Sequence, residues 1–166
     1  MRYEGQRWSK VSSGITSTLN AVWGSGPSDV YAVGDRGMML HFDGTVWSAV
    51  NTGLSTQITL KDVWGSGPSD VWVVGDQGTM LHFDGARWQP SGYKTQSSFY
   101  AVQGSGPGDV YVTVSNGEVL YWNGKKWATL ATGMRDTFGG LWVRAPGDIW
   151  LSGSDAVIMR LHNDTK

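Results

Sequence analysis

One stretch of this sequence occurs twice with few changes. Residues 21–35 read AVWGSGPSDVYAVGD, and residues 62–76 read DVWGSGPSDVWVVGD. Two weaker copies follow, because the same proline recurs at nearly equal intervals and an aspartate stands two positions after it. The recurring residues are Pro27, Pro68, Pro107 and Pro146, followed by Asp29, Asp70, Asp109 and Asp148. A period of about 40 residues predicts that one supersecondary unit is repeated along the chain.

A tryptophan marks the second half of each repeat. It follows the proline at a constant distance in three repeats, at Trp47, Trp88 and Trp127. Trp8, in YEGQRW, occupies the matching context near the N-terminus, because residues 159–166 align in register with residues 1–8. We therefore interpret the chain as a single domain of four circularly offset repeats. Their predicted boundaries are about 18–57, 58–97, 98–136 and 137–166, the last completed by 1–17.

Each repeat contains four short apolar stretches, which we name strands a to d in chain order. In the first repeat these are LNAVWG at 19–24, DVYAVG at 29–34, MMLHF at 38–42, and a fourth that begins at the tryptophan. GSGPSD between strands a and b, and DG between strands c and d, are turn signals. Four strands in about 40 residues, repeated four times, predict an all-β fold, a β-propeller of four-stranded blades.

The stretch WGSGPSDVYAVGDRGMMLHFDGTVW at 23–47 resembles bacterial propeller repeats related to the BNR/Asp-box family and to photosystem II assembly-factor-like propellers. The resemblance covers all four repeats, although Asn123 replaces the turn aspartate in the third and the fourth lacks the tryptophan. It implies a β-propeller fold in which the Asp-box is a structural turn. It also implies a bacterial, secreted or periplasmic origin.

The predicted ring must close. We expect the strand around Trp8 to pair as strand d with strands a to c of the last repeat, which removes an open sheet edge. Closure within one chain gives a four-bladed monomer, and closure between two chains gives an eight-bladed homodimer, which we favour. The circular offset also suits an engineered or excised propeller fragment that assembles into a ring without a ligand.

Composition excludes several classes of function. The net charge of −1 provides no basic surface for nucleic acid, and the absence of cysteine excludes disulfides and thiol chemistry. No apolar run approaches the ~20 residues of a membrane-spanning helix, and residues 1–10 lack the apolar core of a signal peptide. The four repeated aspartates are expected to bond their own turns rather than to hold a metal. We therefore expect no cofactor, no metal, no nucleic-acid partner and no membrane insertion.

The variable part of the repeat is the connection from strand d to the next strand a. The stretch from the tryptophan to the next proline is longer between Trp47 and Pro68 than in the other repeats, whereas the distance from proline to tryptophan is constant. Binding residues concentrate on variable loops that a rigid scaffold carries. The predicted ligand-binding residues in these connections are Thr52, Gln57, Tyr93, Lys94, Gln96, Arg135 and Asp136, joined by Asp35, Arg36, Asp76 and Gln77 from the turns between strands b and c.

Loops rich in hydroxyl and amide groups beside aromatic rings favour lectin-like recognition of a neutral carbohydrate. A protein-interaction propeller is the alternative, because the fold does not dictate the ligand. No enzyme is expected, since the sequence contains no Ser-His-Asp elbow, phosphate loop or metal-ligand spacing. A glycosidase would need two carboxylates facing one sugar, and the acids available on these loops are Asp35, Asp76, Asp136 and Asp155. His41 and His82 occupy equivalent positions in separate repeats, which makes them poor partners for one metal.

Overall fold

A computed structural model of the chain describes residues 2–4 and 7–162, with side chains from residue 9 onward. The described residues form 17 strands, a short 3₁₀ turn η1 (Asp35–Gly37) and a second, η2 (Ser154–Ala156). All strands after the first two make four antiparallel sheets, which we call blades 1 to 4 in chain order. Blade 1 contains β3 (Leu19–Gly26), β4 (Asp29–Gly34), β5 (Met39–Phe42) and β6 (Trp47–Ala49); blade 2 contains β7 (Leu60–Gly67), β8 (Asp70–Gly75), β9 (Met80–Phe83) and β10 (Trp88–Pro90); blade 3 contains β11 (Phe99–Gly106), β12 (Asp109–Val114), β13 (Val119–Trp122) and β14 (Trp127–Leu130); and blade 4 contains β15 (Phe138–Ala145), β16 (Asp148–Gly153) and β17 (Ile158–His162).

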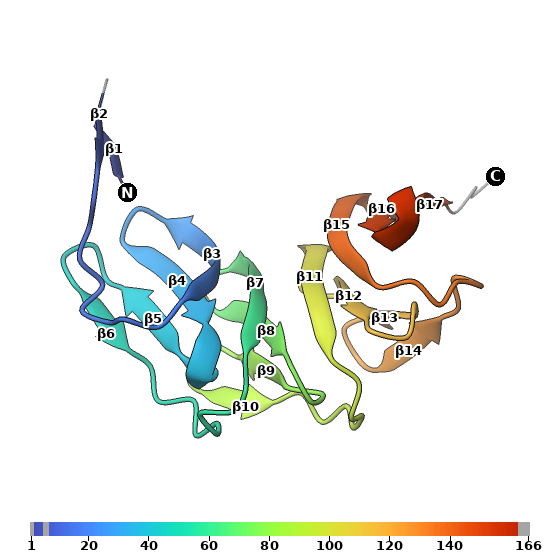
Figure 1. Cartoon of the computed structure of the whole chain (residues 1–166), viewed down its shortest axis with the longest axis horizontal. Helices are drawn as coiled ribbons and strands as arrows, with labels where there is room; N and C mark the ends of the chain where they lie inside the picture. The colour runs from blue at the N-terminus through green and yellow to red at the C-terminus, as the bar shows by residue number, and fades with distance from the viewer. Residues whose placement is uncertain (1, 5–6, 163–166) are drawn as a thin grey trace.

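Consecutive strands pair within each blade, and the first strands of successive blades lie next to one another. The blades therefore follow an arc, with β3, β7, β11 and β15 on its inner side and β6, β10 and β14 on its outer side (Figure 1). This arrangement is that of a β-propeller, so the predicted all-β fold of four repeated blades is confirmed.

The turn between strands a and b is shorter than the sequence predicts. Strand a of blade 1 continues through the glycines to Gly26, so only Pro27 and Ser28 lie outside the two strands. The pairing shifts register between Gly24 and Gly26. A β-bulge accommodates the extra residue, which lets most of GSGPSD belong to the strands rather than to a loop.

Three apolar clusters join neighbouring blades. The first residue of strand a is fully buried in each of blades 2 to 4, at Leu60, Phe99 and Phe138. A tryptophan on strand a also packs against a glycine of the next blade, because a Cβ on Gly65 would lie 2.6 Å from Cη2 of Trp23. Packing between blades, rather than within one, therefore forms the core.

The N-terminal strand does not close the last blade of the same chain. β2 (Arg7–Ser9) pairs with β1 (Arg2–Glu4), and this hairpin extends away from blade 1, while the ends of the arc stay apart (Figure 1). Tyr3 pairs with Trp8 in the register that joins Phe42 to Trp47, so the hairpin repeats the pairing of strands c and d. Closure within one chain, one of the two predicted alternatives, is thus replaced by a local pairing, because closing a short hairpin loop costs less conformational entropy than closing the ring. Among the described residues, blade 4 has three strands.

Candidate binding face

The connections from strand d to strand a and the turns between strands b and c lie on one face of the arc. In every blade, the residue after strand b donates its backbone N–H to the carbonyl of the residue before strand a. The pairs are Asp35 to Thr18 at 3.0 Å, Asp76 to Thr59 at 3.0 Å, Ser115 to Ser98 at 2.9 Å, and Ser154 to Thr137 at 3.3 Å. We call this surface the loop face.

Glycines in the turns between strands b and c hold the connections close to the blades. Gly78 has a φ of +70°, and a Cβ there would lie 2.0 Å from the carbonyl oxygen of Thr95. Gly117 has a φ of +83°, and a Cβ there would lie 2.4 Å from the carbonyl oxygen of Met134. Only glycine combines this backbone conformation with so close an approach, so the loop face is built on closely packed backbone.

The predicted ligand-binding residues of the connections differ in exposure. The hydroxyl of Thr52 donates to the carbonyl of Gly37 at 3.2 Å, so it supports the loop. Tyr93 is half-buried, with its ring 6.3 Å from that of Phe99 and 6.4 Å from that of Trp127. Asp136 is half-buried as well, whereas the remaining predicted residues of the connections are exposed: Gln57, Lys94, Gln96 and Arg135.

Asp76 belongs to a polar cluster between blades 2 and 3, and Gln77 beside it is exposed. The carboxylate of Asp76 accepts from Lys61 Nζ at 2.7 Å and from Ser98 Oγ at 3.1 Å. Burial raises the pKa of Asp76, but the hydrogen bonds from Lys61 and Ser98 outweigh burial and leave the pKa below its ordinary value. The Lys61 ammonium also lies 3.8 Å from the centre of the Tyr100 ring, within the range of a cation–π contact.

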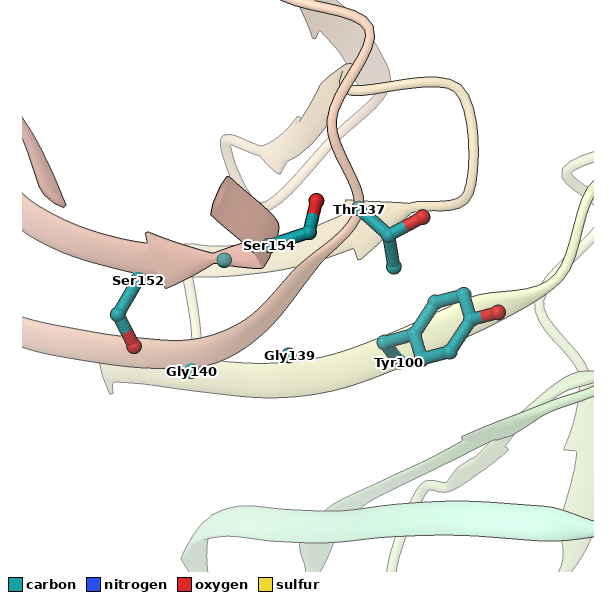
Figure 2. Close-up of a pocket in the computed structure, with 7 residues that line it drawn as sticks. Tyr100, Thr137, Gly139, Gly140, Ser152 and Ser154 are labelled. Atoms are coloured by element: carbon teal, nitrogen blue, oxygen red, sulfur yellow. The ribbon is translucent and has the colours of Figure 1, made fainter. Parts of the chain in front are cut away.

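Two shallow pockets open on the loop face. The smaller, of about 220 Å³, contains the predicted pair Asp35 and Arg36 together with Thr16, Ser17 and Thr18. The larger, of about 450 Å³, lies between blades 3 and 4 (Figure 2). Its lining residues are Tyr100, Thr137, Gly139, Gly140, Ser152, Gly153 and Ser154. None of the predicted ligand-binding residues lines the larger pocket, and the structure does not bring them together in one site.

A signal for the larger pocket was present in the sequence. Tyr100 and Gly139 occupy the second position of strand a, where the other repeats have Asn20 and Lys61. The residue before this position is always apolar, but the position itself changes in every repeat. Such variation inside a regular strand indicates a side chain directed to a surface that differs between blades.

The four repeated aspartates begin strand b, at the opposite end of each blade from the loop face. Each carboxylate is held by groups of its own blade: Asp29 by Ser25 and His41, Asp70 by Ser66 and His82, Asp109 by Ser105 and Tyr111, and Asp148 by Arg144 and Arg160. The part of the chain that the structure describes contains no group of three or more His, Cys, Asp and Glu side chains suited to a metal ion.

The Ser25, Asp29 and His41 cluster is not a catalytic triad. The Asp29 carboxylate accepts from Ser25 Oγ on one oxygen and contacts His41 Nε2 at 2.7 Å on the other. The carboxylate therefore stands between the hydroxyl and the imidazole. A triad needs the histidine to bond the nucleophile directly.

Each repeated tryptophan of blades 1 to 3 packs against its own blade, and two of them also contact the preceding blade: between ring centres, Trp88 lies 5.5 Å from Tyr31 and Trp127 lies 5.3 Å from Trp72. Trp47 lies 5.3 Å from Phe42 between ring centres, and Trp88 lies 5.4 Å from Phe83. Trp127 is half-buried, and its Nε1 is a buried donor without a partner among the described residues. These three rings support the outer strands. The side chain of Trp8 lies outside the described side chains.

Within the described residues there is no helix of the length and apolarity needed to cross a membrane. The blades and their loop face define a β-propeller with open pockets on one face. No protein-family model matches this sequence, and the comparison with curated proteins finds no match.

Solved structures do resemble the fold. "YCF48 bound to D1 peptide" superposes with a TM-score of 0.71 at 20% identity, covering 91% of this chain and 53% of that one. "YCF48 from Cyanidioschyzon merolae" gives a TM-score of 0.69 at 18% identity, covering 90% of this chain and 55% of that one. This chain therefore spans about half the length of these propellers. The likeness shows the fold, whereas the BNR/Asp-box relation and the bacterial origin stay predictions.

Proposed function

We propose that this chain is a non-enzymatic protein-interaction propeller that binds an extended peptide segment in the 450 Å³ pocket between blades 3 and 4. The observation that carries the proposal is the bare backbone of β15 at Gly139 and Gly140, which lines this pocket. Three hydroxyl-bearing residues stand around it, at Thr137, Ser152 and Ser154 (Figure 2).

A peptide suits this pocket because β15 has a free edge there. Within the described residues β15 pairs only with β16. On its other edge the N–H of Val143 donates to Gln103 Oε1 at 2.6 Å, and the stretch of this edge at the pocket carries N–H and C=O groups that an extended strand can pair with. Gly139 is exposed, and a Cβ placed on it would meet no atom within 4 Å. Gly139 thus leaves room for a second backbone, whereas the space beside Gly140 holds the Ser152 hydroxyl, since a Cβ on Gly140 would lie 2.2 Å from Ser152 Oγ. The hydroxyls that line the pocket can bond side chains or amides of the ligand.

A carbohydrate fits the same surface less well. A sugar needs a free aromatic face, and the ring of Tyr93 is half-buried against Phe99. Tyr100 lines the pocket, but the Lys61 ammonium already occupies one face of its ring at 3.8 Å. The solved propeller described as bound to a D1 peptide supports the peptide class further, although at 20% identity it shares only the fold with this chain.

Selection from a phage-displayed library of random dodecapeptides tests the proposal. We expect peptides of a shared sequence pattern to be enriched and to bind the purified chain in fluorescence-anisotropy titrations. The variant Gly139→Val fills the open space beside β15 and should weaken binding at least tenfold. Gly106→Val is the matched control, because a Cβ on Gly106 also meets nothing within 4 Å but lies at the end of β11 near the turn between strands a and b.

Three outcomes would overturn the proposal. The first is a selection that enriches no peptide family, and the second is enrichment of peptides whose affinity Gly139→Val leaves unchanged. The third is binding on a panel of immobilised neutral glycans that Gly139→Val abolishes while peptides fail to bind. That third result would restore the carbohydrate hypothesis for the same pocket.

A further inference from the structure

The face of blade 1 that points away from blade 2, at one end of the arc, exposes apolar side chains whose counterparts in the interior blades are buried. Val22 on β3 is 67% exposed, whereas the residues at the same position of the next two repeats, Val63 and Val102, are 4% and 2% exposed. The difference arises because a preceding blade covers Val63 and Val102. Leu19 shows the same contrast, since it is 39% exposed and its counterpart Leu60 is fully buried.

The face of blade 4 that points away from blade 3, at the other end of the arc, also exposes apolar side chains that an interior blade buries. Trp150 is 38% exposed, but its counterpart Trp72 in blade 2 is 2% exposed. Ile158 is 71% exposed, and its counterpart Met80 is 3% exposed. In blade 2 these positions face the following blade. Blade 4 therefore presents the half of an interface that a following blade would cover.

The interior interfaces show how the two halves fit. Trp64 on β7 packs against Gly104 on β11, since a Cβ on Gly104 would lie 2.6 Å from Cη2 of Trp64. Trp23 and Gly65 make the same contact between blades 1 and 2. The tryptophan of one blade thus occupies the space that the missing side chain of a glycine leaves in the next.

One tryptophan has no glycine of a following blade to pack against, and one glycine has no tryptophan of a preceding blade. The two residues stand at opposite ends of the arc. Trp142 occupies the tryptophan position in blade 4 and is 52% exposed. Gly24 occupies the glycine position in blade 1, where the three atoms nearest to an added Cβ belong to Asp29 and Val30 of the same blade.

We propose that a second copy of this chain covers both faces, so that two chains form a head-to-tail ring of eight blades. Blade 4 of each copy stacks on blade 1 of the other, with Trp142 packed against the partner's Gly24 as Trp23 packs against Gly65. A second copy is the fitting occupant because the chain carries both halves of an interface between blades that it already forms three times internally, twice with the tryptophan–glycine contact and once with Gln103 and Val143 in its place. A heterologous contact of this kind builds a closed assembly when its rotation closes.

Light scattering after size exclusion measures the result. We expect a mass of about 36 kDa, twice the 18.0 kDa of one chain. Val22→Lys should reduce the mass to that of one chain, because a lysine ammonium would be buried against blade 4 of the partner. Trp142→Ala tests the opposite end of the chain and should have the same effect.

Val46→Lys is the matched control. Val46 is also an exposed valine of blade 1, at 52%, but it lies in the turn before β6, and the other repeats carry Arg87 and Lys126 at this position. This variant should keep the mass of two chains. Circular dichroism of all three variants should match the wild type, because each altered side chain is exposed in the single chain.

A wild-type mass equal to that of one chain at every concentration would overturn the ring, and so would a dimer that survives both Val22→Lys and Trp142→Ala. A mass above that of two chains would overturn closure by a pair. Loss of the dimer in Val46→Lys, with folding intact, would place the contact elsewhere on blade 1 and would also contradict the proposal.

Discussion

The half-buried carboxyl of Asp62 should give this protein an unusual dependence of stability on pH. Asp62 lies on β7, where its Oδ2 accepts the N–H of Val102 on β11 and its Oδ1 accepts the N–H of Val63, each at 2.9 Å. Burial raises the pKa of this carboxyl from its ordinary 3.8 to about 6, although the two backbone hydrogen bonds oppose the rise.

The sign of the effect follows from proton binding in the two states. Between pH 3.8 and about 6, the folded chain holds the Asp62 proton more tightly than the unfolded chain does. The stability that this protonation contributes is fully present below pH 3.8 and is lost as the pH rises through about 6. At about 1.4 kcal/mol per pKa unit, the rise of about 2 units corresponds to roughly 3 kcal/mol.

Urea unfolding of the wild type and of Asp62→Asn at pH 4 and pH 7.5 isolates this contribution. The asparagine side chain does not titrate. On going from pH 4 to pH 7.5, the unfolding free energy of Asp62→Asn should therefore rise by about 2 kcal/mol relative to that of the wild type. Asp76→Asn serves as a control of opposite sign, because the pKa of Asp76 lies below its ordinary value. A difference between the wild type and Asp62→Asn that stays constant with pH would refute the reasoning.

Two further substitutions test the packing between blades. In Gly104→Ala, the new Cβ would lie 2.3 Å from the carbonyl oxygen of Asp109 and 2.6 Å from Trp64, so we expect the free energy of unfolding in urea to fall by about 3 kcal/mol or more. Gly106→Ala is the control, because nothing lies within 4 Å of its new Cβ, and it should change this free energy by less than about 0.5 kcal/mol. Equal losses in the two variants would contradict the prediction. In Trp127→Phe, the lost ring area is offset by removal of the buried Nε1 donor that has no partner among the described residues, so the net change should stay within about 1 kcal/mol; thermal unfolding that shows a loss above about 3 kcal/mol would mean that this donor is satisfied in the folded protein.

The strands could be predicted from the sequence because particular residue types mark where they begin and end. A proline, an aspartate and a glycine recur at fixed distances, and each restricts the backbone locally. Pro27 and Pro68 both follow the first strand of their blades directly. The turn itself was predicted too long, because the glycines of GSGPSD are compatible with a bulged strand as well as with a loop.

The sites could not be predicted in the same way. The larger pocket depends on Gly139 and Tyr100, which belong to different repeats and meet only because blades 3 and 4 pack side by side. Thr52 and Tyr93 carry polar groups that could bind a ligand, but a hydroxyl or a ring in a short connection can also stabilise the connection itself. Thr52 bonds the backbone of Gly37, and Tyr93 packs on the core.

Val22 and Val63 occupy the same position in two repeats, and their different burial shows that the stability contributed at a position depends on the adjacent blade as well as on the residue itself. Replacing Val63 by alanine removes two buried carbon atoms, at about 0.8 kcal/mol each, and leaves a small cavity, so the expected loss is about 2 kcal/mol. In a single chain, Val22→Ala should cost only about 0.5 kcal/mol, because two thirds of this side chain already contacts water. In the head-to-tail ring the two losses should converge, so the cost of Val22→Ala in urea unfolding should rise with protein concentration toward that of Val63→Ala. A cost that keeps its single-chain value at every concentration would mean that no second blade covers Val22.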